Sequence, residues 1–470
     1  MDCGHLGIAG PKIAIATMKL IFKNLPLFLI LFLCAFSRAQ DADPLEARQI
    51  AKEAYIYGFP MVENYRVQYA RFAGGWNTIR ELPIDSAEPY PKQDTLNAYV
   101  AVDLRAEPMI IEVLPHTDDR YYTIQFADLY TYNFAHLGSR ISNTNFGVFL
   151  LTGPSWKPFH DWKPVGVYQV IRCETDFAFL FYRTVANGPG DLDAAAVRQD
   201  FKIYSLSAYN GQTAAVPAAP VAFMAPLPAE VERTSLDFFK ELNFVLQFCP
   251  TPPAEAALME RFGKIGIGPG KTFEPLYFDP QIQAAIKKGM VDAWKTLDDA
   301  KKKLDSGNIS FSGLFGSRDE LGNNYINRML GAVEGLNSDS RVELTEERYV
   351  LDSKSEKLTG KKNRYRVHFD PEQIPPVNGT WSLTLYSLPS KQFFSDAMGR
   401  NEINAAMLSN LARDFDGGLT ISIQHDAPND ETAANWIPAP NGPFALSLRL
   451  YGPKPQVFDG SWTKPTVRRL

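Results

Sequence analysis

Apolar and polar residues alternate in two long stretches of the chain, and this pattern predicts short β-strands in both. The strands expected between residues 76 and 207 are Leu96–Leu104, Met109–Leu114, Tyr121–Phe134, Val148–Leu151, Val165–Arg172 and Phe177–Val185. Those expected after residue 348 are Arg364–Phe369, Trp381–Leu388, Leu419–His425 and Phe444–Tyr451. Short strands at regular spacing, separated by turn residues, are typical of β-sandwiches. We therefore expect two β-sandwich domains.

Helical periodicity precedes the first of these stretches and lies between the two. Asp43-Pro44 is a typical helix start, and Gly58-Phe59-Pro60 is expected to break or kink that helix. A second helical piece then runs from Met61 to about Phe72. Further helices are expected at Ala194–Lys202, Gln281–Leu304 and Asn324–Val333.

The resulting organisation is mainly β with a helical connector. We expect N-terminal helices over residues 40–75 and the first β-sandwich over 76–209. A linker and helical connector occupy 210–340, and the second β-sandwich occupies 341–470. The linker is assigned at Asn210–Glu230, because this stretch is rich in Ala and Pro and nearly free of charge.

The N-terminal residues have the organisation of a secretory signal peptide. Basic residues around Met18–Lys23 are followed by the apolar run Leu25–Phe36 and by Ser37-Arg38-Ala39, which fits a cleavage site. The apolar run is about a dozen residues, shorter than the roughly 20 that a membrane span needs. Residues 1–39 are therefore expected to be a cleaved signal peptide, with an uncleaved anchor as the alternative. The expected location of the protein is periplasmic or extracellular.

This interpretation predicts a mature chain that begins at or near Gln40 when the protein is expressed in its native host. Intact-mass measurement and N-terminal sequencing test it. A mature chain that retains Met18 would contradict it.

Composition and charge restrict the classes of partner. The chain has a formal net charge of −5, and residues 40–470 alone have −8, which argues against a nucleic-acid partner. Cys173 and Cys249 are the cysteines that remain after residue 39. Two unpaired buried thiols are the expected state, because a chain of this size does not depend on a disulfide, and one disulfide is the alternative.

The stretch Arg120–Arg140 places ionisable side chains where apolar ones are expected. Asp128 and His136 share the parity of Ile124 and Phe126 in this alternating segment. A buried carboxylate must be paired or hydrogen-bonded, and Arg140 is a candidate partner. Asp128, His136 and Arg140 are therefore the candidate catalytic residues, with a structural hydrogen-bond centre at Asp128 as the alternative. The candidate ligand-binding residues are Tyr130, Asn133, Trp381 and Trp436.

No established catalytic, cofactor or metal motif is found in the sequence. Gly266–Thr272 partly matches a phosphate-binding loop, but Ile265 occupies the place of its first glycine. No Gly-x-Ser-x-Gly, His-Glu-x-x-His or Cys-x-x-Cys occurs, and no two histidines are spaced as a metal pair. We therefore expect neither a cofactor nor a metal, and the oligomeric state stays open.

Several long segments resemble one known family. In the first half they are AYIYGFP from Ala54, DTLNAYVAVDL from Asp94 and RYYTIQFADLYTYNFAHLGSR from Arg120. In the second half they are WSLTLYS from Trp381, LTISIQHDAP from Leu419 and NWIPAPNGPFALSLRLY from Asn435. The chain thereby resembles the family that joins domain of unknown function 1254 to domain of unknown function 1214.

The resemblance implies an immunoglobulin-like sandwich, then helices, then a jelly-roll-like sandwich. It implies no established activity and supplies no catalytic residues. The chain departs from the family pattern at Asn97-Ala98, where Tyr-Ser is more usual, so a pocket lined by this segment would take a different ligand.

Three functions follow as hypotheses. A binding protein for a glycan or a small apolar ligand would have a cleft lined by exposed aromatic side chains. A hydrolase or lyase would bring Asp128, His136 and Arg140 together in a pocket. A structural or oligomerising envelope protein would expose a large apolar patch. Binding is the leading hypothesis, because no catalytic motif was found.

Overall fold

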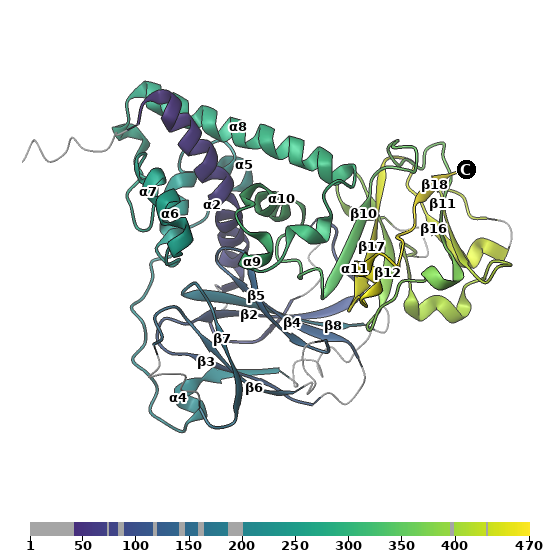
Figure 1. Ribbon diagram of the computed structural model, residues 1–470, viewed down its shortest axis with the longest axis horizontal. Helices are drawn as coiled ribbons and strands as arrows, with labels where there is room; N and C mark the ends of the chain where they lie inside the picture. The colour runs from purple at the N-terminus through teal and green to yellow at the C-terminus, as the bar shows by residue number, and fades with distance from the viewer. Residues whose placement is uncertain are drawn as a thin grey trace, which may run out of the picture.

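The computed structural model describes residues 42–72, 75–82, 89–115, 120–140, 146–157, 164–186, 201–394, 399–428 and 431–470. The fold is mainly β, with four sheets and a helical layer. The helical layer lies above the first pair of sheets, and the second pair lies beside both (Figure 1). The expected signal peptide lies outside the described residues.

Two sheets enclose the core of the first β region. The strand orders are β1-β2-β8-β4-β5 and β7-β6-β3-β9. The strands are β1 Arg80–Glu81, β2 Thr95–Asp103, β3 Met109–Val113, β4 Tyr122–Asp128, β5 Asn133–Gly138, β6 Gly147–Thr152, β7 Val167–Arg172, β8 Phe177–Val185 and β9 Phe201–Ser205. Every second residue of the strands, such as Val100, Ile111, Leu151 and Leu180, faces the shared core. The expected alternation is thus confirmed on the inner faces.

The C-terminal region repeats this arrangement. Its strand orders are β10-β17-β12-β13, with β14 paired to β12, and β16-β15-β11-β18. The strands are β10 Leu344–Tyr349, β11 Tyr365–Phe369, β12 Trp381–Ser387, β13 Gln392–Phe393, β14 Glu402–Asn404, β15 Leu419–Gln424, β16 Trp436–Pro438, β17 Phe444–Tyr451 and β18 Val467–Arg469. Val367, Leu383, Ile421 and Leu448 contribute to the core between the sheets.

The helical layer is built on two long helices, α2 and α8, that pack against each other and run in the same general direction from the upper left of the view (Figure 1). The helices are α2 Pro44–Phe72, α4 Leu206–Tyr209, α5 Ala229–Glu232, α6 Phe238–Leu246, α7 Ala256–Gly263, α8 Pro280–Asp305, α9 Arg318–Leu321, α10 Tyr325–Gly335 and α11 Gln456–Asp459. A Cβ on Gly289 of α8 would lie 2.4 Å from the carbonyl oxygen of Arg48. Glycine is therefore needed where the two helices meet.

Helix α2 continues through Gly58-Phe59-Pro60, so the expected break is wrong. A proline inside a helix costs about 3 kcal/mol, but burial of an apolar face can outweigh that cost. Gly58 has a packing role instead, because a Cβ there would lie 2.4 Å from a methyl group of Leu242 on α6. The neighbouring helices thus hold α2 in one piece.

The structure also corrects one predicted helix and settles the form of one predicted strand segment. The described end of the helix expected at Ala194–Lys202 is a strand, β9, because Phe201 packs into the first core. The segment Tyr121–Phe134, expected as one strand or a strand pair, is a hairpin that continues to Gly138. Cys173 and Cys249 are both buried and unpaired.

The expected linker is extended. Residues 212–228 form neither helix nor strand and run along the outside of the molecule from α4 to α5 (Figure 1). Its first half is largely exposed, whereas Phe223 further on packs against Phe72, Trp76 and Phe177. The hydroxyl of Tyr65 also donates a hydrogen bond to the carbonyl oxygen of Met224.

This difference predicts where a protease cuts first. Elastase, which cleaves after small residues, should cut first within residues 211–220, because that backbone is exposed and few side chains hold it. Cuts within 221–228 should come later. Mass spectrometry of the early fragments is the measurement. First cuts inside Tyr121–Phe134 would contradict the strand assignment.

Candidate functional site

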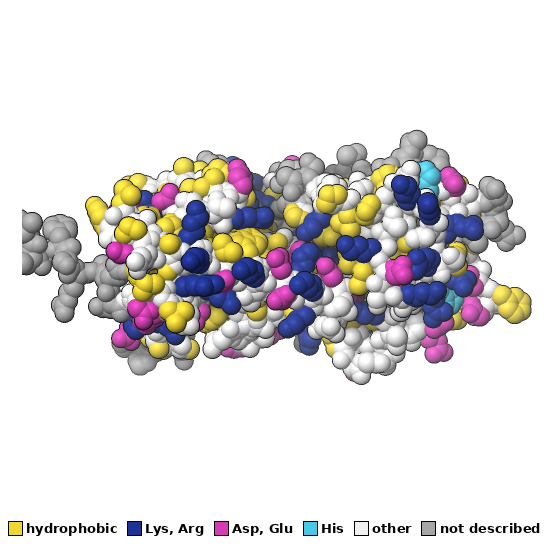
Figure 2. Space-filling view, turned by 90° about the horizontal axis from the view of Figure 1, so that it is seen from above, with side chains coloured by type: hydrophobic (Ala, Val, Ile, Leu, Met, Phe, Trp, Pro, Cys, Tyr) yellow, Lys and Arg dark blue, Asp and Glu magenta, His cyan; other side chains and the backbone are white. Residues whose placement is uncertain are grey.

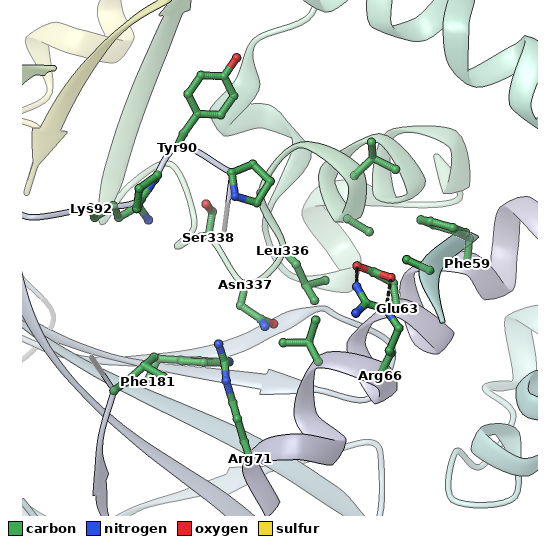
Figure 3. Close-up of a pocket in the computed structure, with 18 of the residues that line it drawn as sticks. Phe59, Glu63, Arg66, Arg71, Tyr90, Lys92, Phe181, Leu336, Asn337 and Ser338 are labelled. Atoms are coloured by element: carbon green, nitrogen blue, oxygen red, sulfur yellow. Dashed lines mark hydrogen bonds and ion pairs between the residues drawn. The ribbon is translucent and has the colours of Figure 1, made fainter. Parts of the chain in front are cut away.

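A cavity of about 390 Å³ lies where the helical layer, the first sheet and the loops Pro89–Lys92 and Leu336–Ser338 meet. Figure 3 shows Glu63 and Arg66 of α2 on one side of it and Lys92 on the opposite side. Its apolar lining includes Phe59, Val67, Leu82, Tyr90, Phe181 and Leu336. This volume is within the range of small-molecule sites.

The polar lining of this cavity is mainly cationic. The basic lining residues are Arg66, Arg71, Lys92, Arg183, Arg233 and Arg348, and the acidic ones are Glu63 and Glu232. On the outside of the molecule, seen from the side of α8, Lys and Arg are spread along the face with Asp and Glu among them (Figure 2). The cation excess of the cavity lining thus occurs in a chain whose overall charge is negative.

Three of the basic side chains have carboxylate partners. Arg66 lies 2.5 Å from a carboxylate oxygen of Glu63, and Arg183 lies 3.2 Å from Asp339. Nε of Arg348 donates to Oε1 of Glu346 at 2.8 Å. These pairs are fixed and leave little charge available to a ligand.

Lys92 and Arg233 have no carboxylate partner within the described ranges. The guanidinium of Arg233 lies over the ring of Trp294, 4.7 Å from its centre. Neither side chain forms a hydrogen bond or ion pair with another described residue. Lys92 is half-buried and Arg233 is exposed, so both charges are accessible to an anionic ligand in the cavity.

The wall that carries Lys92 is held by the C-terminal sheet. Arg449 donates to the carbonyl oxygen of Tyr90 at 2.9 Å. The hydroxyl of Tyr386 donates to the carbonyl oxygen of Pro91 at 2.7 Å. The carboxylate of Asp94 accepts from the hydroxyl of Tyr451 at 2.6 Å and from that of Ser382 at 2.7 Å. We name residues 89–94 the clamped segment.

The opposite loop, after α10, is held by the first sheet. Nη2 of Arg183 donates to the carbonyl oxygen of Asn337 at 2.9 Å, and Gln125 and Asn133 donate to that of Ser338. Asn337 has φ 62° and Tyr90 in the clamped segment has φ 55°. Such backbone angles are strained in a bulky residue such as Tyr and persist where surrounding contacts enforce them. Both loops are thus rigidly positioned around the cavity.

Glu232, one of the two glutamates that line the cavity, is largely protonated near neutral pH. Burial, and the nearby carboxylate of Glu63, raise the pKa of Glu232 to about 8. Its neighbour Glu241, outside the cavity lining, has its pKa raised to about 7, mainly by burial. Glu232 therefore contributes little negative charge to the cavity at pH 7.

The structure does not bring the three candidate catalytic residues together. Asp128 ends β4 and accepts a hydrogen bond from the backbone N–H of Tyr132 at 2.8 Å. Nε2 of His136 lies 3.5 Å from Asp339, and Arg140 lies 2.6 Å from Glu343. Each residue has a partner of its own, and none of the three lines the cavity. Asp128 is a buried turn residue, since its carboxylate fixes the β4–β5 turn.

Nor do the candidate ligand-binding residues line the cavity. Trp381 is in the C-terminal core, because its position in β12 faces inward with Leu383. Trp436 is buried and donates from its indole to the carbonyl oxygen of Gln424. The hydroxyl of Tyr130 donates towards the carbonyl oxygens of Cys249 and Pro250. Asn133 bonds to Ser338 beside the cavity.

Sequence reasoning missed the residues that do line it. Of the lining residues, Arg183 could have been found from the sequence pattern, because it interrupts the apolar run Phe177–Val185 just as Asp128 interrupts its own strand. Lys92 and Arg233 lie in segments without periodicity, and no pattern marks them. Asn97, at the departure from the family pattern, also lines the cavity.

Residues 42–470, outside the gaps given above, hold no group of three or more His, Cys, Asp or Glu arranged as metal ligands. In the same ranges, no helix has both the length and the apolar character that a membrane crossing requires.

Comparison with solved structures identifies the fold. The VPA0106 protein from Vibrio parahaemolyticus aligns with 90% of this chain and 100% of its own, at 24% identity and a TM-score of 0.69. An uncharacterised protein from Burkholderia cenocepacia aligns with 94% of this chain and 95% of its own, at 12% identity and a TM-score of 0.42. The comparison with curated proteins gave no match.

Comparison with family profiles confirms the resemblance found in the sequence. Residues 77–205 match the family described as protein of unknown function DUF1254. Residues 346–455 match the family described as protein of unknown function DUF1214. The matches cover the two β regions, in the expected order. The chain therefore belongs to the family that pairs an N-terminal DUF1254 domain with a C-terminal DUF1214 domain.

Proposed function

We propose that this protein binds a small molecule with an apolar body and an anionic group in the cavity between the helical layer, the first sheet and the clamped segment. The observation that carries the proposal is the presence of two cations without carboxylate partners, Lys92 and Arg233, in a partly apolar cavity of about 390 Å³. Aromatic carboxylates and uronic acids combine these properties. The binding hypothesis from the sequence, a glycan or a small apolar ligand, is thereby narrowed to an acidic ligand.

The lining supports this class of ligand in two ways. Phe59, Tyr90 and Phe181 offer ring surfaces to an apolar body or to the face of a sugar. Arg233 offers a guanidinium, which binds carboxylate or phosphate in a two-pronged geometry. Glu232 opposes an anion only weakly at neutral pH, because its raised pKa keeps it largely protonated.

A thermal-shift and calorimetric screen tests the proposal. The purified protein is titrated with benzoate, glucuronate and glucose 6-phosphate, each beside its neutral counterpart: benzamide, glucose and methyl glucoside. At least one anion should raise the melting temperature and bind by calorimetry, and its neutral counterpart should not. Binding by neither, or equally by both, would overturn the proposal.

A variant then assigns the binding to the cavity. Arg233→Gln should weaken binding of the anion about 10- to 100-fold, because one charge-assisted hydrogen bond is lost. Lys295→Gln is the matched control, since Lys295 is 71% exposed on α8 and lies outside the cavity lining. Equal weakening by both variants would mean that the anion binds elsewhere.

We also propose that binding takes place outside the cytoplasm. The support is the basic, apolar and small-residue order of residues 18–39. The mass measurement of the mature chain described above is its test.

We further propose that the two sheet pairs are an immunoglobulin-like and a jelly-roll-like sandwich. The support is the family resemblance together with one shared apolar core in each pair. Superposition on reference domains of both types, with strand connectivity compared one by one, is the test.

A further inference from the structure

The side chain of Lys92 has no polar partner in the part of the chain that the structure describes. It lines the cavity from the clamped segment, and no hydrogen bond or ion pair to its amine is formed there. Lys92 is half-buried, and an ammonium group partly removed from water usually acquires such partners, because an uncompensated charge is costly. The amine of Lys92 is thus available for a ligand.

The surroundings of Lys92 favour the neutral amine. Burial, and next the guanidinium of Arg183, lower the pKa of Lys92 to about 8, with Arg449 acting in the same direction. Glu346 and Asp339 act in the opposite direction, but both carboxylates are already engaged by arginines. A lysine beside other cations in a cavity has the chemistry of an amine nucleophile.

The backbone that carries Lys92 is fixed on both sides. The carbonyl oxygens of Tyr90 and Pro91 accept from Arg449 and Tyr386, and Asp94 accepts from two hydroxyls of the C-terminal sheet. Gln93 also donates to Asn401 at 3.0 Å. A nucleophile must be held in place relative to its ligand, and this segment meets that requirement.

We propose that Lys92 forms an imine with the carbonyl group of an anionic ligand, a 2-oxo acid or an aldehyde acid, bound in the cavity. The proposal rests on the proposed function, since the unpaired cation Arg233 would hold the acid group. The amine nitrogen adds to the carbonyl carbon, and the carbinolamine then loses water. The water contains the carbonyl oxygen and two protons that come from the amine, so no oxidant or reductant is consumed.

Reductive trapping tests this chemistry. The full-length mature protein is incubated with pyruvate, phenylpyruvate or glyoxylate and sodium cyanoborohydride, and tryptic peptides are mapped by mass spectrometry. One reduced adduct per chain is expected at Lys92. Its labelling near pH 7.5 should be at least about tenfold faster than that of the exposed Lys295, because a lower pKa gives a larger neutral fraction.

Two variants and one competitor separate the possible results. Lys92→Arg retains the charge but cannot form an imine, so it should abolish the adduct. Lys295→Arg should leave labelling of Lys92 unchanged. Phenyllactate, which has a hydroxyl in place of the carbonyl, should compete with phenylpyruvate without forming an adduct.

The outcomes distinguish this inference from the proposed function. Calorimetric binding of phenylpyruvate or phenyllactate without preferential labelling of Lys92 would overturn the imine and leave the binding function in place. Absence of binding by every anion tested would overturn both. Equal labelling of Lys92 and Lys295 would mean ordinary surface chemistry and would overturn the imine.

Discussion

Glu346→Gln is expected to lower the free energy of unfolding by about 3–5 kcal/mol, because it leaves buried guanidinium groups without a counter-ion. Glu346 is 1% exposed, and Arg449 is fully buried. Oε1 of Glu346 lies 2.8 Å from Arg348, and Oε2 lies 3.4 Å from Arg449. Ser447 also donates to this carboxylate. Urea unfolding at pH 7, followed by circular dichroism, measures the change.

The adjacent residue supplies the control. Glu347 points to the other side of β10 and pairs with the half-exposed Lys464, so Glu347→Gln should cost less than about 1 kcal/mol. Equal costs for the two variants would show that the buried cluster contributes no more than a surface pair does.

Acid should destabilise the wild type more than the Glu346→Gln variant. Burial alone would raise the pKa of Glu346, but Arg348 and Arg449 hold it well below the usual range for a glutamate. The folded-state pKa is depressed, so the contribution to stability is present above the unfolded value of about 4.5 and is lost as the pH falls below it. The wild type should therefore lose more stability than Glu346→Gln between pH 5 and pH 3.

Asp128→Asn is expected to make the protein more stable at pH 8 and to remove part of the pH dependence of unfolding. Burial is the main cause that raises the pKa of Asp128 to about 7. The folded-state pKa lies above the unfolded value of 3.8, so the wild type loses stability as the pH rises from about 4 to 7. The loss is on the order of 4 kcal/mol at pH 8. Asparagine cannot ionise and retains an oxygen for the N–H of Tyr132.

Two further variants make this prediction specific. Asp128→Ala removes the acceptor for the buried N–H of Tyr132 and should cost about 1–3 kcal/mol at pH 5. Asp298→Asn, on the exposed side of α8, should leave the pH profile unchanged. The midpoints of urea unfolding at pH 5 and pH 8 measure the stability of each variant. An Asn variant with the wild-type profile would contradict burial of the carboxylate.

The same variant also decides between the two roles considered for Asp128 in the sequence. A site residue would lose ligand binding in Asp128→Asn, whereas a turn residue outside the cavity should not. We expect anion binding to be unchanged. A loss of binding with normal stability would return Asp128 to the candidate site.

Most of the strands could be predicted from sequence because their inner faces are apolar at every second position. The strand β12 was predicted correctly, but the burial of its outer face was not. Ser382, Thr384 and Tyr386 alternate with the core residues of β12, and such polar positions usually face solvent. Here they are buried against the clamped segment and β14. A single sequence gives no sign of what covers a polar face.

Strand β10 was not predicted, and the cause is again that distant parts of the chain cover its polar side chains. Its sequence, Leu344 to Tyr349, contains Glu346, Glu347 and Arg348 and lacks the apolar residues of a typical strand. Its charges are compensated by Arg449 of β17, a partner about a hundred residues away in the chain. Pairing at that separation depends on the assembled fold, so periodicity cannot reveal it.

The three candidate catalytic residues have separate partners in the structure for a related reason. Parity within Arg120–Arg140 identified Asp128 and His136 as unusual, and both are indeed in polar contacts. The hairpin, however, places Asp128 at its turn, whereas Arg140 lies beyond the opposite end of β5. Arg140 was the expected partner of Asp128, but it pairs with Glu343, and His136 lies beside Asp339 from the loop after α10.

The clamped segment has a consequence for any attempt to divide this protein. It belongs to the chain that leads into β2, yet the bonds that hold its backbone come from β12 and β17. A fragment that ends at residue 340 would contain every lining residue of the cavity except Arg348, but not the sheet that positions Lys92. Its helices and first two sheets would keep their own cores. Such a fragment should fold and still fail to bind, so the proposed binding function would require both halves.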